Sequence, residues 1–204
     1  MFDLSGLEKS LAGIGVRPGR EIFVELDACY GHESRHYHDR SHVSECLRQF
    51  ENFHGLADRV HEIEVAIWFH DAIYDTRRQD NEEKSAELAT VCLALQGAQV
   101  DIVERIARMI IATKTHVTEG GDAALLVDID LGILGTPKPR FEQYDAAIRR
   151  EYDWVPEETY RQGRREVLEG FLQRDRIYQT DVIGDLYEAA ARKNLQRKIS
   201  ELSG

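Results

Sequence analysis

The sequence contains few cysteines and no long apolar segment. Its three cysteines, Cys29, Cys46 and Cys92, are widely separated and form no Cys-x-x-Cys pair. This odd count without framework spacing predicts reduced thiols in a reducing compartment. No run of about 18 apolar residues indicates a membrane span, and the first residues, MFDLSGLEKSLAGIG, lack the apolar core of a signal peptide. We therefore expect a cytoplasmic protein.

Basic residues are also fewer than acidic residues. The chain has 26 Lys and Arg residues against 37 Asp and Glu residues, for a formal net charge of −11 at pH 7. Such an acidic chain repels the phosphates of nucleic acids and anionic membranes, so neither is an expected partner. A single small phosphate can still be admitted where a metal ion or a few basic side chains balance its charge.

No segment shows the alternation of a half-buried β-strand, and apolar residues recur with a helical period almost throughout. The Gly and Pro residues at 135–139 indicate a turn. We expect an all-α fold, a compact bundle of about eight or nine helices forming a single domain over residues 1–204. Its metal-site core would span about 30–135, with the C-terminal helices at 138–204 packed on it. The segments with helical periodicity are 17–30, 41–53, 58–74, 80–97, 101–113, 122–134, 140–152, 156–174 and 185–202.

Ionisable residues interrupt otherwise apolar helical segments at four positions. The stretch EVAIWFHDAIYD carries His70 and Asp71 side by side, while His42 and Asp130 lie in or beside other apolar stretches. A buried carboxylate is costly unless it is paired or bound to a metal, and imidazole and carboxylate groups suit a divalent cation. Adjacent helical residues point about 100° apart, so the pair can reach one ion between helices. The alternative is a structural hydrogen-bond cluster without metal.

The stretches HYHDRSHV, WFHDAIYD, NEEKSA and LLVDIDLGILG together resemble the HD-domain superfamily of metal-dependent phosphohydrolases, and more closely its small bacterial branch of predicted HD phosphohydrolases. The resemblance covers roughly residues 30–135. It implies that His42, the pair His70 and Asp71, and Asp130 hold one divalent ion. Asp128 is the alternative to Asp130, and the two point about 200° apart on a helix. We expect Asp130 to be the ligand and Asp128 to cap a helix or face solvent.

Further residues near these four are candidates for contact with substrate. His36 and His38 could bind a phosphate, although both could equally be loop or surface histidines. Lys114 and His116 could also bind phosphate, the alternative being an interaction with the end of their helix. Glu82 could orient a ligand or a water, although helix capping is at least as good an explanation. Relatives that bind two metals use more histidines in this region than the single His116, so the sequence favours one metal.

The function expected is hydrolysis of a phosphomonoester or phosphodiester, with a nucleotide among the candidate substrates. The candidate catalytic residues are Asp71, Glu82 and Lys114, with Asp71 able to accept a proton from water. The cofactor would be one divalent metal ion (Mn, Co, Fe, Zn, Ni or Mg), and a homodimer is left open. The alternative function is a regulatory module that binds a metal and a nucleotide or phosphate without turning it over.

Overall fold

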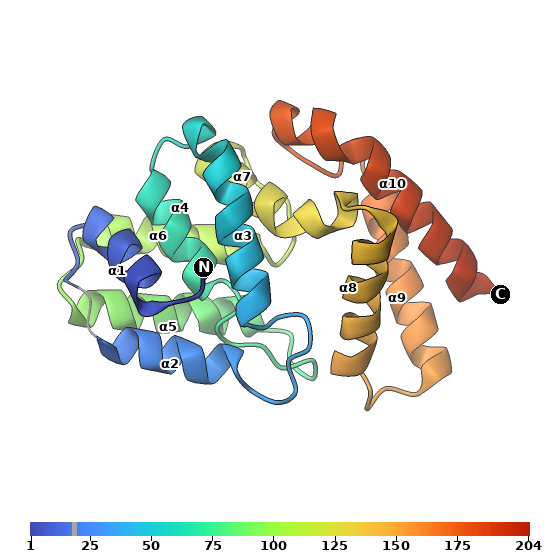
Figure 1. Cartoon of the computed structure of the whole chain (residues 1–204), viewed down its shortest axis with the longest axis horizontal. Coiled ribbons are helices and arrows are strands. Elements are labelled where there is room, and N and C mark those ends of the chain that lie inside the picture. The colour runs from blue at the N-terminus through green and yellow to red at the C-terminus, as the bar shows by residue number, and fades with distance from the viewer. Residues whose placement is uncertain (18–19) are drawn as a thin grey trace. The chain divides into compact units, whose positions relative to one another are not determined.

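The computed structural model describes residues 1–17 and 20–204. Over these residues the chain is all-helical, as predicted, with ten α-helices, two short 3₁₀ segments and no β-strand (Figure 1). It divides into two compact units, 1–129 and 130–204. Among the described residues, no helix combines the length and apolarity needed to cross a bilayer. The single-domain organisation stays a prediction.

The first unit is built around a helix whose C-terminal half is buried on every side. This helix, α4, carries the run from Val65 to Phe69, in which every side chain is fully buried. A helix that is apolar all round must lie inside a protein, and α4 contacts α1, α3, α5 and α6 (Figure 1). The helical elements of this unit are α1 (Leu4–Gly13), α2 (Arg20–Tyr30), α3 (Arg40–Phe53), η1 (His54–Leu56), α4 (Val60–Phe69), α5 (Asn81–Leu95), α6 (Val100–Ala112) and most of α7 (Gly121–Asp130).

One partly buried ion pair fixes α4 against α6. Glu62 is buried on α4, and Arg105 of α6 donates two hydrogen bonds to its carboxylate, each 2.7 Å long. A two-pronged guanidinium–carboxylate pair sets direction as well as distance. The pair therefore holds the helix that leads directly into the His70 and Asp71 segment.

The second unit contains three long helices and a 3₁₀ segment. Asn194 donates hydrogen bonds of 2.9 Å to the carbonyls of Leu134 and Thr136, which ties the 3₁₀ segment to the last helix. Gly135 lies so close to Tyr187 that a Cβ at residue 135 would be 2.6 Å from the Tyr187 Cβ. The elements of this unit are η2 (Leu131–Gly135), α8 (Lys138–Glu151), α9 (Glu157–Leu172) and α10 (Asp181–Ser203).

Two features of the helices differ from the sequence-based expectation, and part of a third expected helix is not described. Helix α1 was not expected, although Asp3 caps it by accepting a hydrogen bond from the Gly6 amide. Helix α4 ends at Phe69 rather than continuing to Tyr74, which places the His70 and Asp71 pair in the following turn. The first expected helix includes residues 18–19, which lie outside the described residues, and α2 is described from residue 20.

Candidate metal centre

The His70 ring has a fixed orientation and a fixed tautomer. It lies at the C-terminal end of α4, almost completely buried, and its Nδ1 is 2.9 Å from the Ile67 carbonyl oxygen. A carbonyl can only accept a hydrogen bond, so Nδ1 must carry the proton. Nε2 is then the atom that either shares a proton with His42 and Asp71 or binds a metal. Metal-binding histidines are commonly held in this way by a backbone carbonyl.

His42 approaches the same point from the start of α3. The side chain of Asp39 caps this helix by accepting from the amides of Ser41 and His42, which fixes the first turn. The His42 ring is buried, and its Nε2 lies 3.0 Å from Nε2 of His70. Two bare lone pairs at this distance repel each other. The two nitrogens must therefore share a proton or a cation.

Asp71 supplies a carboxylate oxygen to the same place. Its Oδ2 is 3.1 Å from Nε2 of His70 and 3.4 Å from Nε2 of His42. Burial opposes ionisation of this carboxyl group, but the charge of His70 and hydrogen bonds from both histidines outweigh it and hold the Asp71 pKa well below its usual range. The group is therefore a carboxylate at neutral pH, which is the form that binds cations.

A four-residue group of possible metal ligands includes a cysteine that the sequence did not point to. The donor atoms of His42, Cys46, His70 and Asp130 all lie within 4.8 Å of one another. Asp130 is the last residue of α7, and the rest of that helix belongs to the first unit. Cys46 belongs to no Cys-x-x-Cys pair. His42 and Cys46 are nevertheless four residues apart on one helix, a spacing that places two side chains on one face.

Asp130 and Asp128 differ as the helical period predicts. Asp130 belongs to the four-residue group and is partly exposed. Asp128 is fully buried, so the expectation that it would face solvent was wrong. It is one of six successive buried residues that end with Ile129. Helix α7 is therefore embedded almost all round, and a side chain far from Asp130 on this helix still points into protein.

Arg35 holds the turn that carries Asp71. Its buried guanidinium donates from Nη1 to the Asp71 carbonyl at 2.6 Å and to the His38 carbonyl at 3.0 Å, and from Nη2 to the Ala72 carbonyl at 2.7 Å. The same cation lies 5.0 Å from the centre of the Tyr30 ring. Arg35 thus joins the loop before α3 to the turn after α4. No local pattern signals this role, because the contacts span 36 and 37 positions in sequence.

The two histidines that precede the centre have different environments. His38 is half-buried and stacks on Tyr74 with ring centroids 4.0 Å apart. Its ring centroid is also 5.7 Å from that of His42, so His38 lies beside the candidate ligands. His36 is exposed. The role of both in binding substrate stays a prediction.

Lys114, Glu82 and His116 complete the residues singled out from the sequence. The Lys114 amine is bonded to the Glu83 carboxylate at 2.5 Å and to the Gln79 carbonyl at 2.7 Å. Glu82 is half-buried, and its burial, with a contribution from the charge of Asp71, raises its pKa. His116 is half-buried and has a positive φ of 51°. Glu82 is thus within electrostatic range of the centre, whereas the Lys114 amine is engaged by Glu83 and Gln79.

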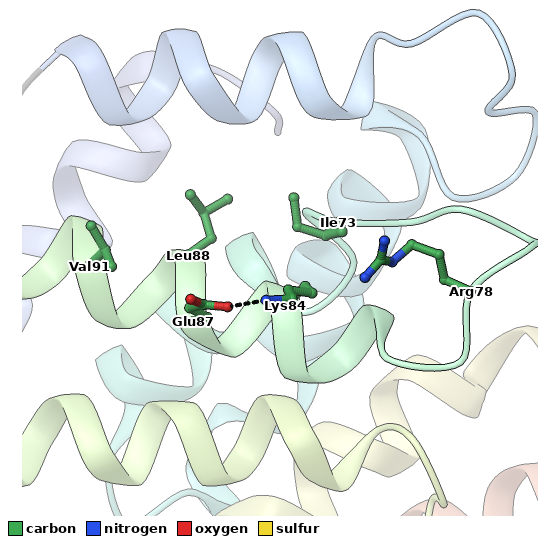
Figure 2. A pocket seen from close by; sticks show the side chains of 6 residues that line it. All are labelled: Ile73, Arg78, Lys84, Glu87, Leu88 and Val91. Carbon is green, nitrogen blue, oxygen red and sulfur yellow. Dashed lines mark hydrogen bonds and ion pairs between the residues drawn. The ribbon is translucent and has the colours of Figure 1, made fainter.

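A surface pocket lies along α5, which follows the Asp71 turn. In Figure 2, Leu88 and Val91 stand on the same side of α5, and Ile73 enters from the preceding loop. Lys84 and Glu87 are bonded to each other at 2.7 Å along this rim. The lining is therefore mainly apolar, with its charges already paired. The residues that line it are Ile73, Arg78, Lys84, Glu87, Leu88 and Val91.

Comparison of the chain with models of protein families, with curated proteins and with solved structures gives no match.

Proposed function

We propose that this protein is a metal-dependent phosphohydrolase that cleaves a phosphomonoester or phosphodiester. The observation that carries the proposal is the convergence of Nε2 of His42, Nε2 of His70 and Oδ2 of Asp71 within 3.4 Å of one another. His42 is 28 positions from His70 in the sequence, so the fold brings these groups together. A cluster of imidazole and carboxylate groups of this kind suits a divalent cation. The step from a metal centre to phosphate hydrolysis rests on the resemblance to HD-domain phosphohydrolases.

Each residue has a definite task in this proposal. His42, His70, Asp71 and Asp130 hold the ion, and the Ile67 carbonyl keeps the His70 lone pair directed at it. A bound divalent ion supplies a water of lowered pKa and draws charge from a phosphate oxygen. Asp71 is the most exposed of the three converging groups, with 13% of its side chain accessible against 2% for His42 and 1% for His70. Its carboxylate can therefore orient a water and accept its proton.

The substrate contacts follow from the surroundings of Asp71. His38 lies next to His42 and stacks on Tyr74, so its ring borders the centre. An imidazole N–H there can donate a hydrogen bond to a phosphate oxygen. Glu82 is the second candidate to handle a proton, because its environment favours the protonated carboxyl. The alcohol or nucleoside portion of the substrate is left open.

Phosphate release tests this proposal directly. Chelator-treated protein is supplied separately with Mn²⁺, Co²⁺, Zn²⁺ and Mg²⁺ and screened against phosphomonoesters, phosphodiesters and nucleotides. We expect release with at least one metal and none without metal. Asp71→Ala should lose release, whereas the control Asp101→Asn, an exposed carboxylate paired with Arg105 on α6, should keep it.

Two results would contradict the proposal. Full release by metal-free Asp71→Ala would show that the centre does not carry the reaction. Tight binding of a nucleotide with no release under any metal would identify a regulatory binding module instead.

A further inference from the structure

Cys46 is a buried residue that lies beside the candidate metal centre. It is 4% exposed on α3, one helical turn after His42, and its Sγ lies 3.8 Å from Nδ1 and 3.9 Å from Nε2 of the His42 ring. The same sulfur belongs to the four-donor group with His70 and Asp130. The other two cysteines, Cys29 and Cys92, are half-buried and lie outside this group. Cys46 is thus the thiol whose position suits a metal.

Two of the donor distances are close to those around a tetrahedral metal ion. With metal–nitrogen bonds of about 2.1 Å and metal–sulfur bonds of about 2.3 Å, donor atoms in a tetrahedron lie roughly 3.4–3.7 Å apart. The two Nε2 atoms are 3.0 Å apart, and Sγ lies 3.9 Å from Nε2 of His42. Both distances differ from the ideal by less than about 0.5 Å. All four donor atoms lie within 4.8 Å of one another.

The groups of the centre differ in their exposure to solvent. His42, Cys46 and His70 are buried, and Asp71 is the more exposed group beside them. Asp71 lies at the accessible side of the ion, where the free oxygen of its carboxylate can act on a water or a substrate. A thiolate among the donors also changes which ion is preferred. Soft sulfur favours zinc and similar transition metals, whereas magnesium and manganese prefer oxygen donors.

We propose that Cys46 is a thiolate ligand of the centre, together with His42, His70 and Asp130, and that it makes the site selective for Zn²⁺, Co²⁺ or Fe²⁺ over Mg²⁺ and Mn²⁺. The thiol gives up its proton to solvent when the metal binds. This inference rests on the metal centre of the proposed function, but it does not require hydrolysis.

Cobalt provides the spectroscopic test. Chelator-treated protein titrated with Co²⁺ should develop a thiolate-to-cobalt charge-transfer band in the near ultraviolet alongside the visible bands of the bound ion. Cys46→Ser should lose the near-ultraviolet band and keep the visible bands, because the histidine and aspartate donors remain. The matched control is Cys92→Ser, which removes a half-buried thiol of α5 outside the group and should leave both sets of bands.

Affinities give the second readout. Competition titrations should show that Cys46→Ser weakens zinc binding by more than about ten-fold while manganese binding changes by less than about three-fold. If Cys46→Ser does not fold, zinc-edge X-ray absorption of the unaltered protein still reports whether a sulfur atom lies about 2.3 Å from the ion.

The outcomes separate the two proposals. Visible cobalt bands without a charge-transfer band, or a zinc spectrum without sulfur, overturns the role of Cys46 and leaves the phosphohydrolase proposal standing. Unchanged selectivity in a folded Cys46→Ser variant has the same meaning. A protein that binds no cobalt or zinc overturns both. A sulfur-bound metal with no phosphate release under any condition supports Cys46 while the proposed function fails.

Discussion

Replacing Arg35 should weaken both the fold and the metal centre. Its buried guanidinium makes three hydrogen bonds of 2.6–3.0 Å to the carbonyls of His38, Asp71 and Ala72. Hydrogen bonds to a charged group each contribute about 1.5–3 kcal/mol. After allowance for the cost of burying the cation, we expect Arg35→Ala to lower the free energy of unfolding by roughly 3–5 kcal/mol. Because Asp71 then loses its support, metal affinity should fall by about 10–100-fold.

Urea denaturation of the metal-free protein and competition titration with zinc measure the two effects. Arg35→Lys keeps a positive charge but not the forked geometry, so it should lose about half as much stability. Arg40→Ala is the matched control, since Arg40 pairs with Asp27 at the surface with 46% of its side chain exposed, and such pairs contribute less than about 1 kcal/mol. If Arg35→Ala is as stable as Arg40→Ala and binds zinc equally well, Arg35 does not support the centre.

Three further predictions concern packing, pH and metal binding. Gly135→Ala should lower the free energy of unfolding by about 2–3 kcal/mol, because its Cβ would be 2.6 Å from that of Tyr187. Gly163→Ala, inside α9 with open space around it, should raise that free energy by about 0.5–1 kcal/mol. If urea denaturation shows Gly135→Ala to be the more stable of the two variants, the packing argument is refuted. Because burial raises the folded-state pKa of Glu82, the metal-free protein should lose stability as pH rises from the unfolded value of about 4.3 through the folded value. Glu82→Gln removes that loss, so the Tm of the variant relative to the unaltered protein should increase across this pH window. A difference in Tm that stays constant with pH would contradict the raised pKa of Glu82. Zinc at 100 times its Kd should stabilise the chelator-treated protein by about 2.7 kcal/mol, whereas an unchanged Tm would show that no site forms on folding.

The sequence predicted the fold class because helical periodicity is a local property. Nine segments with an apolar stripe were expected to form helices, and the structure has an α-helix in each of them. The missed helix, α1, also carried signals: Asp3 caps it, and Leu7 and Leu11 are fully buried on one face.

The end of α4 was not readable from the same pattern. Apolar residues continue past His70, so the periodicity predicted a helix to Tyr74. In the structure the backbone turns after Phe69, and Arg35 takes up the carbonyls of Asp71 and Ala72 that no longer join a helix. A partner some 36 residues away therefore decides where this helix stops, and local propensity has no access to it.

By itself, then, the sequence determined the helical fold class and singled out His42, His70, Asp71 and Asp130 as ionisable residues within apolar surroundings. These follow from residue type and period, which are properties of short stretches. Only the tertiary structure brought Cys46 into the group, placed Asp71 at its exposed side and fixed the His70 proton on Nδ1. The physical reason is that donor convergence depends on how separate helices pack and on which carbonyl meets which ring, and neither is encoded in a single helical turn.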